Sequence, residues 1–297
     1  MNNPDIFPWD ERLSLGNTAI DKDHQRLFSI IRKIILLSRE NDEERVQYAA
    51  KEGLKFLISY AEKHFEKEEQ FMLSVSYPEF ARHKAMHDDF KTNILPALKK
   101  ELDDNDYSME SIRHFLGICT GWLTTHIMMV DQTILHPDKY QRMDLQFSDL
   151  SKTLDAVMKK IIFNLYEMDS QLISNHYTGW DFGKALFYEL TYVTAEKEVI
   201  HLLFTMEQKG VFALASQRAG IEINKVDTYL LTLIKEILSN ITHQIAYYLN
   251  LKGGYRQRSG FMVESNEVEM IFANKHLTYS SLFNTPVGKF AFSIYER

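Results

Sequence analysis

Residues 64–87 read HFEKEEQFMLSVSYPEFARHKAMH, and two spacings in this stretch decide the fold of the first half of the chain. His64 and Glu68 are four residues apart, and so are His83 and His87. Residues four apart project from one face of an α-helix. A proline between the two pairs excludes one continuous helix, because the residue before a proline avoids the α region. The stretch therefore predicts two helices, each with a pair of potential metal ligands on one face.

Hydrophobic spacing predicts four long helices within the first 140 residues. Polar breaks separate them, and the Asn-Asp pair at 41–42 is a typical start of a helix. Four helices joined by short connections form an up-down-up-down bundle. The predicted helices run from residue 17 or 21 to 39 and over residues 42–72, 79–102 and 108–135.

Three further side chains can join the two pairs. His126 and Asp131 are five residues apart on the fourth predicted helix, and His24 lies on the first. A pair five apart diverges more in direction than a pair four apart, so these two should reach different atoms of an extended site. A cluster of two metal ions provides such a site. The complete candidate set is His24, His64, Glu68, His83, His87, His126 and Asp131.

The types of ligand narrow the choice of metal. Imidazoles and carboxylates without thiolates favour iron, zinc or copper over calcium or magnesium. Seven protein ligands are too many for one tetrahedral zinc ion and fit two six-coordinate irons bridged by carboxylates. A lone histidine is more often a surface or core residue, and a single His-x3-Glu pair is common on exposed helices. The combination across four helices is much harder to obtain by chance.

Composition and charge limit the classes of protein to which the chain can belong. The chain has 297 residues, of which 45% are hydrophobic and 12% aromatic, so it suits two packed domains. The net charge of −7 argues against a nucleic-acid partner. The first 150 residues carry 19 Lys+Arg and 26 Asp+Glu, whereas the remainder carries 15 of each. The two halves therefore differ in net charge, as two separate domains can.

The single cysteine, Cys119, excludes an internal disulfide and any multi-cysteine metal site, and it fits a reducing compartment. No apolar stretch approaches the roughly 20 residues that span a bilayer, so no membrane partner is expected. The N-terminus has neither the basic nor the apolar segment of a secretory signal. We expect a cytoplasmic protein.

Further residues around the candidate ligands complete a recognisable pattern. It consists of Phe7-x-Trp9, Leu15-Gly16, Ile20-Asp21-x-x-His24, His64-x3-Glu68, His83-x3-His87 and Trp122-Leu123-x-x-His126-Ile127-x3-Asp131. In this pattern the first half resembles the bacterial hemerythrin family, and every ligand position of the family is filled. The resemblance implies a hemerythrin-like domain over residues 1–140.

The resemblance also implies the cofactor and the role of each ligand. The cofactor is a non-haem centre of two iron ions with an oxo or hydroxo bridge. His83, His87 and His126 would bind one iron and His24 and His64 the other, with Glu68 and Asp131 as bridges. In that family one iron keeps an open position for O2 or another diatomic ligand.

The resemblance also bears on two apolar residues and on two further histidines. Trp122 and Leu123 match the apolar O2 pocket of the family, and a dry pocket favours reversible binding. Simple core packing is the alternative for Trp122. His114 and His136 match no ligand position.

Beyond residue 140 the pattern of the sequence changes. Helices and strand-like runs follow one another, which indicates an α+β domain over residues 141–297. Helices are predicted over residues 150–172, 211–219 and 224–251, and strands over 185–193, 199–204, 260–273 and 289–295, with a turn-rich stretch over 175–183.

The order of these elements, with Gln208-Lys209-Gly210 before the short helix and Thr285-Pro286-Val287-Gly288 before the last strand, is similar to the CheX/CheC-like phosphatases of chemotaxis. The active helix of that family carries a Glu and an amide three residues apart. Here Glu236 and Asn240 are four apart, and Ile237 stands where the acid should be. We therefore assign no catalytic residue and predict an output, dimerisation or partner-docking module.

The sequence leaves three functions open. The first is an O2- or redox-responsive sensor that couples the iron centre to the C-terminal domain and through it to a signalling protein. The second is an O2 or iron carrier or storage protein whose second domain is structural. The third is a di-iron oxidase or peroxidase, which the histidine-rich ligand set disfavours because oxygenase bundles supply mostly carboxylates. The physiological ligand and a homodimer are left open.

Overall fold

The computed structural model describes residues 13–39, 42–135, 150–166, 168–179, 182–194, 197–248 and 256–296. The chain divides into two compact units, residues 1–140 with 216–236 and residues 141–215 with 237–297. The Phe7-x-Trp9 segment, His136 and the predicted domain boundary at residue 140 lie outside the described residues, so that boundary stays a prediction. Among the described helices, none combines the length and the apolar character that a membrane span requires.

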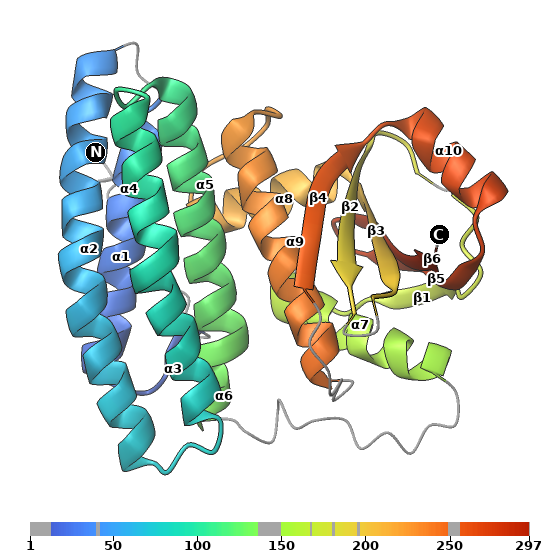
Figure 1. The fold of residues 1–297 in the computed structure, drawn as a ribbon, viewed down its shortest axis with the longest axis horizontal. Coiled ribbons are helices and arrows are strands. Elements are labelled where there is room, and N and C mark those ends of the chain that lie inside the picture. Colours follow the sequence, from blue (N-terminus) through green and yellow to red (C-terminus); the bar gives the residue numbers. More distant parts are fainter. Residues whose placement is uncertain are drawn as a thin grey trace. The chain divides into compact units, whose positions relative to one another are not determined.

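A four-helix bundle forms the first part of the chain, as predicted (Figure 1). Short connections join its four long segments, so successive segments run in opposite directions. They are α1 (Thr18–Leu37), α2 (Glu43–Ser74), α3 (Phe80–Asp89) continued by the π-helical turn η2 (Phe90–Ile94) and α4 (Leu95–Asp104), and α5 (Met109–His126) continued by the π-helical turn η3 (Ile127–Asp131) and α6 (Gln132–Leu135).

Local sequence fixes where these helices begin. The side-chain oxygens of Asn17, Asp42 and Ser108 accept hydrogen bonds from backbone amides in the first turns of α1, α2 and α5. Those amides have no partner within the helix, so each cap satisfies a donor that would otherwise be left unpaired.

The segment that precedes α1 is tied to one end of the bundle. Asp21 Oδ1 accepts a hydrogen bond of 2.7 Å from the Leu15 amide, and Asp21 Oδ2 accepts one of 2.6 Å from the Ser14 hydroxyl. These bonds hold the Leu15 side chain, which is fully buried, in an apolar cluster with residues from α1, α2 and α6. The cluster consists of Leu15, Ile20, Met72, Tyr77 and Ile134. The Leu15-Gly16 and Ile20-Asp21 parts of the sequence pattern are therefore structural.

A six-stranded antiparallel sheet, with helices on both faces, forms the second part of the chain and confirms the α+β class (Figure 1). Its strand order is β1-β5-β6-β3-β2-β4. The strands are β1 (Gln171–Ser174), β2 (Ala185–Val193), β3 (Val199–Glu207), β4 (Arg256–Val263), β5 (Leu277–Thr285) and β6 (Gly288–Glu296), and the helices are α7 (Leu150–Tyr166), α8 (Gln208–Ala219), α9 (Thr228–Tyr248) and α10 (Ser265–Asn274).

Different helices cover the two faces of this sheet. On one face α7 is held by buried Asp155, whose Oδ1 accepts hydrogen bonds from Tyr279 (2.6 Å) and Ser281 (2.7 Å) of β5. On the other face Val268 of α10 packs into a cluster with Leu203, Val263 and Tyr295. Because both faces are covered, β2 and β3 each contain a run of five consecutive buried residues.

One predicted element of the second half is wrong, and two strands were not predicted. The strand predicted over residues 260–273 is the end of β4 followed by helix α10. Glu264 and Glu267 form a capping box that starts this helix, and the apolar residues of the run masked that signal. Strands β1 and β5 were missed because serines interrupt their apolar pattern. The helix predicted over 150–172 ends at Tyr166.

Candidate metal centre

Seven buried side chains meet in the core of the bundle. None of them is more than 2% exposed. α1 supplies one, α2 and α3 supply two each, α5 supplies its last residue, and η3 supplies its last residue. They are His24, His64, Glu68, His83, His87, His126 and Asp131. The structure thus brings together every ligand candidate named from the sequence.

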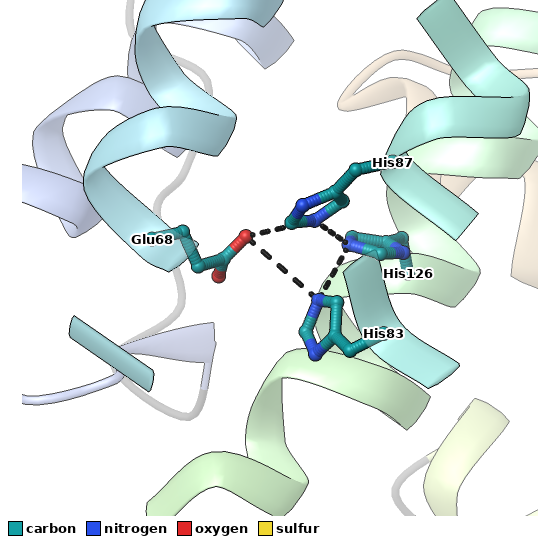
Figure 2. Close-up of side chains that lie close together, drawn as sticks. All are labelled: Glu68, His83, His87 and His126. Carbon is teal, nitrogen blue, oxygen red and sulfur yellow. Dashed lines mark hydrogen bonds and ion pairs between the residues drawn. The ribbon is translucent and has the colours of Figure 1, made fainter. Parts of the chain in front are cut away.

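Three histidines and one glutamate form the larger of two groups (Figure 2). The Nε2 atom of His126 lies 3.1 Å from His83 Nε2 and 2.9 Å from His87 Nε2. Glu68 Oε2 lies 3.2 Å from His87 Nε2 and 3.9 Å from His83 Nε2. One ligand atom from each of the four residues lies within 4.8 Å of all the others.

Two histidines form the smaller group and share Glu68 with the larger one. His24 Nε2 and His64 Nε2 are 3.1 Å apart, and Glu68 Oε2 lies 4.0 Å from His64 Nε2. Asp131 also faces both groups, because its Oδ1 lies 3.0 Å from His126 Nε2 and its Oδ2 lies 3.5 Å from His24 Nε2. Both carboxylates therefore lie between the two histidine groups.

The nitrogen–nitrogen distances fit metal ions with octahedral coordination. Two nitrogens bound at about 2.1 Å to one ion are about 3.0 Å apart at a right angle and about 3.4 Å apart in a tetrahedron. The Nε2–Nε2 separations of His87–His126, His24–His64 and His83–His126 are 2.9, 3.1 and 3.1 Å. They agree with the right-angled arrangement.

Unpaired buried oxygens give a second reason to expect cations. Within the described part of the chain, neither carboxylate oxygen of Glu68 or of Asp131 accepts a hydrogen bond. Buried carboxylates without a partner are very costly, so a structure that places two of them side by side requires a compensating positive charge. The donor set therefore fits a pair of metal ions.

Burial sets the protonation of the cluster in the metal-free chain. Burial lowers the pKa of His24 and of His83 to about 3, and it lowers the pKa of His126 well below the ordinary value. These imidazoles are therefore neutral near pH 7, and the neutral form is the one that binds a metal. Burial, followed by the charge of Glu68, raises the pKa of Asp131.

A π-helical turn explains how Asp131 reaches His126. The five-residue spacing predicts side chains that diverge, whereas the two ligand atoms are 3.0 Å apart. In η3 the backbone hydrogen bond runs from residue i to i+5, so the turn holds one residue more than an α-helical turn. The extra residue places Asp131 over His126, which regular helical geometry would not do.

Two carboxylates contact the outer nitrogens of candidate ligands, and the sequence did not identify either of them. His87 Nδ1 lies 3.2 Å from Glu69 Oε1, and Lys84 Nζ lies 3.3 Å from Glu69 Oε2. His64 Nδ1 lies 3.8 Å from Asp23 Oδ2, to which Lys67 donates a hydrogen bond of 2.8 Å. A hydrogen bond such as the one between His87 and Glu69 orients a metal-bound imidazole and raises its basicity, whereas Asp23 lies beyond hydrogen-bond distance of His64.

Aromatic rings enclose the larger group. The Trp122 ring stacks on His126 at 4.2 Å between centroids and 13° between planes, and Phe90 stacks on Trp122 at 4.0 Å. Phe65, which was not singled out from the sequence, stacks on His87 at 4.0 Å. Leu123, next to Trp122 on α5, is also buried. This side of the site is therefore apolar, and the assignment of Trp122 and Leu123 to an O2 pocket stays a proposal.

The second half of the chain is similar to solved structures of chemotaxis proteins. CheX from Vibrio vulnificus is 8% identical, with 50% of this chain and 97% of that chain covered and a TM-score of 0.38. CheX from Desulfovibrio desulfuricans is 10% identical, with 50% and 99% covered and a TM-score of 0.38. Because these identities and scores are low, the fold class of this half rests on its own antiparallel sheet.

The first half is similar to known iron proteins. Residues 15–136 match the family described as the hemerythrin HHE cation binding domain. Bacteriohemerythrin of Clostridium acetobutylicum is 30% identical over 128 residues, which cover 43% of this chain and 97% of that protein. Myohemerythrin of Theromyzon tessulatum is 28% identical over 128 residues, which cover 43% and 90%. The chain belongs to the hemerythrin family, whose cofactor is a non-haem pair of iron ions.

Proposed function

We propose that the bundle binds O2 reversibly at a di-iron centre and that the chain is an oxygen- or redox-responsive regulator. The observation that supports O2 binding is the unequal number of histidines in the two groups, three against two, with both carboxylates shared. If both ions have the same coordination number, the ion with fewer protein ligands has one position open for a small molecule.

Each of the seven side chains has a proposed role. His83, His87 and His126 hold one iron, His24 and His64 hold the other, and Glu68 and Asp131 bridge the pair. When bound, the iron pair supplies the electrons for reversible association with O2.

The surrounding residues keep the site dry and its ligands oriented. Trp122, Phe65 and Phe90 exclude water from the side of the larger group. This apolar wall would lie beside the iron with three histidines, whereas the open position would belong to the other iron. The wall lowers the dielectric around the pair as a whole, so loss of a bound molecule as a charged species is disfavoured. Glu69 accepts a hydrogen bond from His87 Nδ1, which leaves Nε2 of that ring free to bind iron.

The metal content and optical spectrum of the protein test this proposal. Protein purified without oxygen should contain about two irons per chain, in line with the two ligand groups. A visible charge-transfer band should appear on aeration and disappear on reduction. The variant His126→Ala should lose the band, whereas His114→Ala should keep it, because His114 pairs with Glu101 away from the cluster. A colourless protein with one metal ion, or steady O2 consumption with a reductant, contradicts reversible O2 binding.

The regulatory role requires that the iron state changes the second domain. A bound ligand transmits nothing unless it favours one arrangement of the output element over another. The separate α+β unit supports an output role, with a signalling protein as its partner. Hydrogen exchange of residues 150–296 and the oligomeric state should therefore differ between the oxygenated and reduced forms. Identical exchange and assembly in both forms would instead favour a carrier with a structural second domain.

A further inference from the structure

A cavity of about 580 Å³ lies between α10 and the sheet face formed by β2, β3, β4 and β6. Small-molecule sites typically enclose about 300–1,000 Å³, so this cavity is large enough for a small organic ligand. Every residue that lines it belongs to the second unit of the chain. The cavity is therefore a feature of that unit and shares no residue with the metal centre.

Buried polar groups form the floor of this cavity. Glu189 is 6% exposed, and its Oε1 accepts hydrogen bonds from His201 Nδ1 at 2.8 Å and Thr191 Oγ1 at 3.2 Å. Its Oε2 accepts a hydrogen bond from the Tyr295 hydroxyl. Burial, followed by this hydrogen bond, raises the pKa of Tyr295, so the phenol keeps its proton. Both oxygens of the carboxylate are thus satisfied by the protein.

One polar atom of this floor is left over. The His201 ring stacks on Tyr295 at 4.7 Å between centroids, and its Nδ1 faces Glu189. Its other nitrogen, Nε2, is buried and has no hydrogen-bond partner among the residues that the structure describes. In the tautomer whose Nδ1–H donates to Glu189, Nε2 is an acceptor, so it calls for a donor such as a hydroxyl group.

The walls and mouth of the cavity supply two further kinds of contact. Phe261 and Met270 line it and are 48% and 56% exposed, so both offer apolar surface to a ligand. Arg258 and Lys275 also line it and are exposed, and no ion pair holds either of them within the described ranges. These cations favour a ligand with a negative charge.

We propose that this cavity binds a small hydroxylated organic acid. Its apolar body packs against Phe261 and Met270, its hydroxyl group donates to His201 Nε2, and its carboxylate faces Arg258. Within the described part of this unit, the ligand satisfies the unpaired Nε2 atom of the floor, covers the two exposed apolar side chains and pairs with Arg258. The site gives the second unit a chemical input of its own, independent of the function proposed for the bundle.

Calorimetric titration of the intact, iron-loaded chain with para-hydroxybenzoate, benzoate and phenol tests this site. The first compound carries both polar groups, whereas benzoate lacks the hydroxyl and phenol lacks the carboxylate. We expect saturable binding of one para-hydroxybenzoate per chain, with each of the other two about tenfold weaker. The absence of saturable binding at millimolar concentration overturns the proposal.

Pairs of cavity and control variants test which residue contacts the hydroxyl group of the ligand and which contacts its carboxylate. His201→Gln should abolish the preference for para-hydroxybenzoate over benzoate, whereas His276→Gln, at an exposed residue that does not line the cavity, should keep it. Arg258→Gln should abolish the preference over phenol, whereas Arg256→Gln on the same strand should keep it. Unchanged preferences in both cavity variants overturn the proposal.

A third variant covers the case in which His201→Gln does not fold. Ile271→Trp fills the cavity from α10 and leaves the contacts of Glu189 in place. It should abolish binding of para-hydroxybenzoate and leave the iron content unchanged. Full binding by this variant shows that the acid binds elsewhere and overturns the assignment.

Discussion

Asp131 Oδ1 lies 3.0 Å from His126 Nε2, although Asp131 is five positions further along the chain. The π-helical turn η3 creates this contact by adding one residue between them. The same carboxylate reaches His24 through its other oxygen, at 3.5 Å. One backbone irregularity thus connects the two histidine groups of the site.

Replacing Asp131 should therefore affect both metal positions. Asp131→Asn keeps the shape of the side chain but removes the negative charge that a bridging ligand supplies. We expect the iron content to fall from about two per chain to one or fewer, with the helices retained. Elemental analysis measures this. Asp104→Asn, at an exposed position of α4, is the control, and full iron content in Asp131→Asn contradicts the proposed bridge.

Removal of the carboxylate behind His87 should weaken metal binding without removing a ligand. Glu69 Oε1 lies 3.2 Å from His87 Nδ1, and loss of such a partner typically costs about 10- to 100-fold in metal affinity. Competition with a chelator should show this loss for Glu69→Gln. Glu66→Gln, at an exposed position on the same helix, should retain the affinity of the unmodified chain. Equal affinities for the two variants would show that the contact has no such effect.

Acid should destabilise the metal-free bundle. Burial lowers the pKa of His24 and His83 to about 3 and depresses that of His126, so these three rings take up protons on unfolding below about pH 6.5. Asp131, whose pKa is raised, releases a proton on unfolding and so offsets part of the proton uptake by the three rings. The net uptake of about two protons should lower the free energy of unfolding by about 3 kcal/mol per pH unit between about pH 6 and pH 5.

Urea unfolding of the metal-free chain, followed by its helical circular dichroism, measures this slope. His83→Phe removes one of the three rings and should reduce the slope by about one proton. Leu73→Phe, at an exposed position of α2 that does not titrate, should leave it unchanged. A free energy that is independent of pH in the unmodified chain would contradict the protonation states given above.

In the sheet domain, Asp155 should be a sensitive position. Its Oδ1 accepts hydrogen bonds from the buried Tyr279 and Ser281. Asp155→Ala leaves both hydroxyl groups without this acceptor and should lower the free energy of unfolding of this domain by about 2–4 kcal/mol. Asp155→Asn keeps an acceptor oxygen and should cost less. Thermal unfolding compares the two variants, and equal losses would mean that the hydrogen bonds are not the cause.

The bundle could be predicted from sequence because its signals are local. A histidine and a glutamate four residues apart lie on one helix face whatever surrounds them, and caps such as Asp42 act within one turn. The convergence of four such faces follows from the short connections between helices. This is why all seven candidate ligands lie together in the structure.

Other features could not be predicted from the sequence because they depend on tertiary contacts. Glu69 faces His87 across two helices, and its position 18 residues away carries no periodic signal. The cluster around Glu189 draws its members from three strands whose pairing order, β6-β3-β2, cannot be read from spacing. In residues 260–273 the capping box at Glu264 starts a helix. The apolar composition of the same residues had favoured a strand.

The stack of Phe90, Trp122 and His126 also provides an optical reporter within the protein. Trp122 lies in van der Waals contact with a candidate ligand, at 4.2 Å between ring centroids. An iron centre that absorbs light and accepts electrons at this range quenches the emission of an excited indole. The fluorescence of Trp122 should therefore fall as iron enters the apoprotein, so cofactor loading can be followed in real time without an added dye.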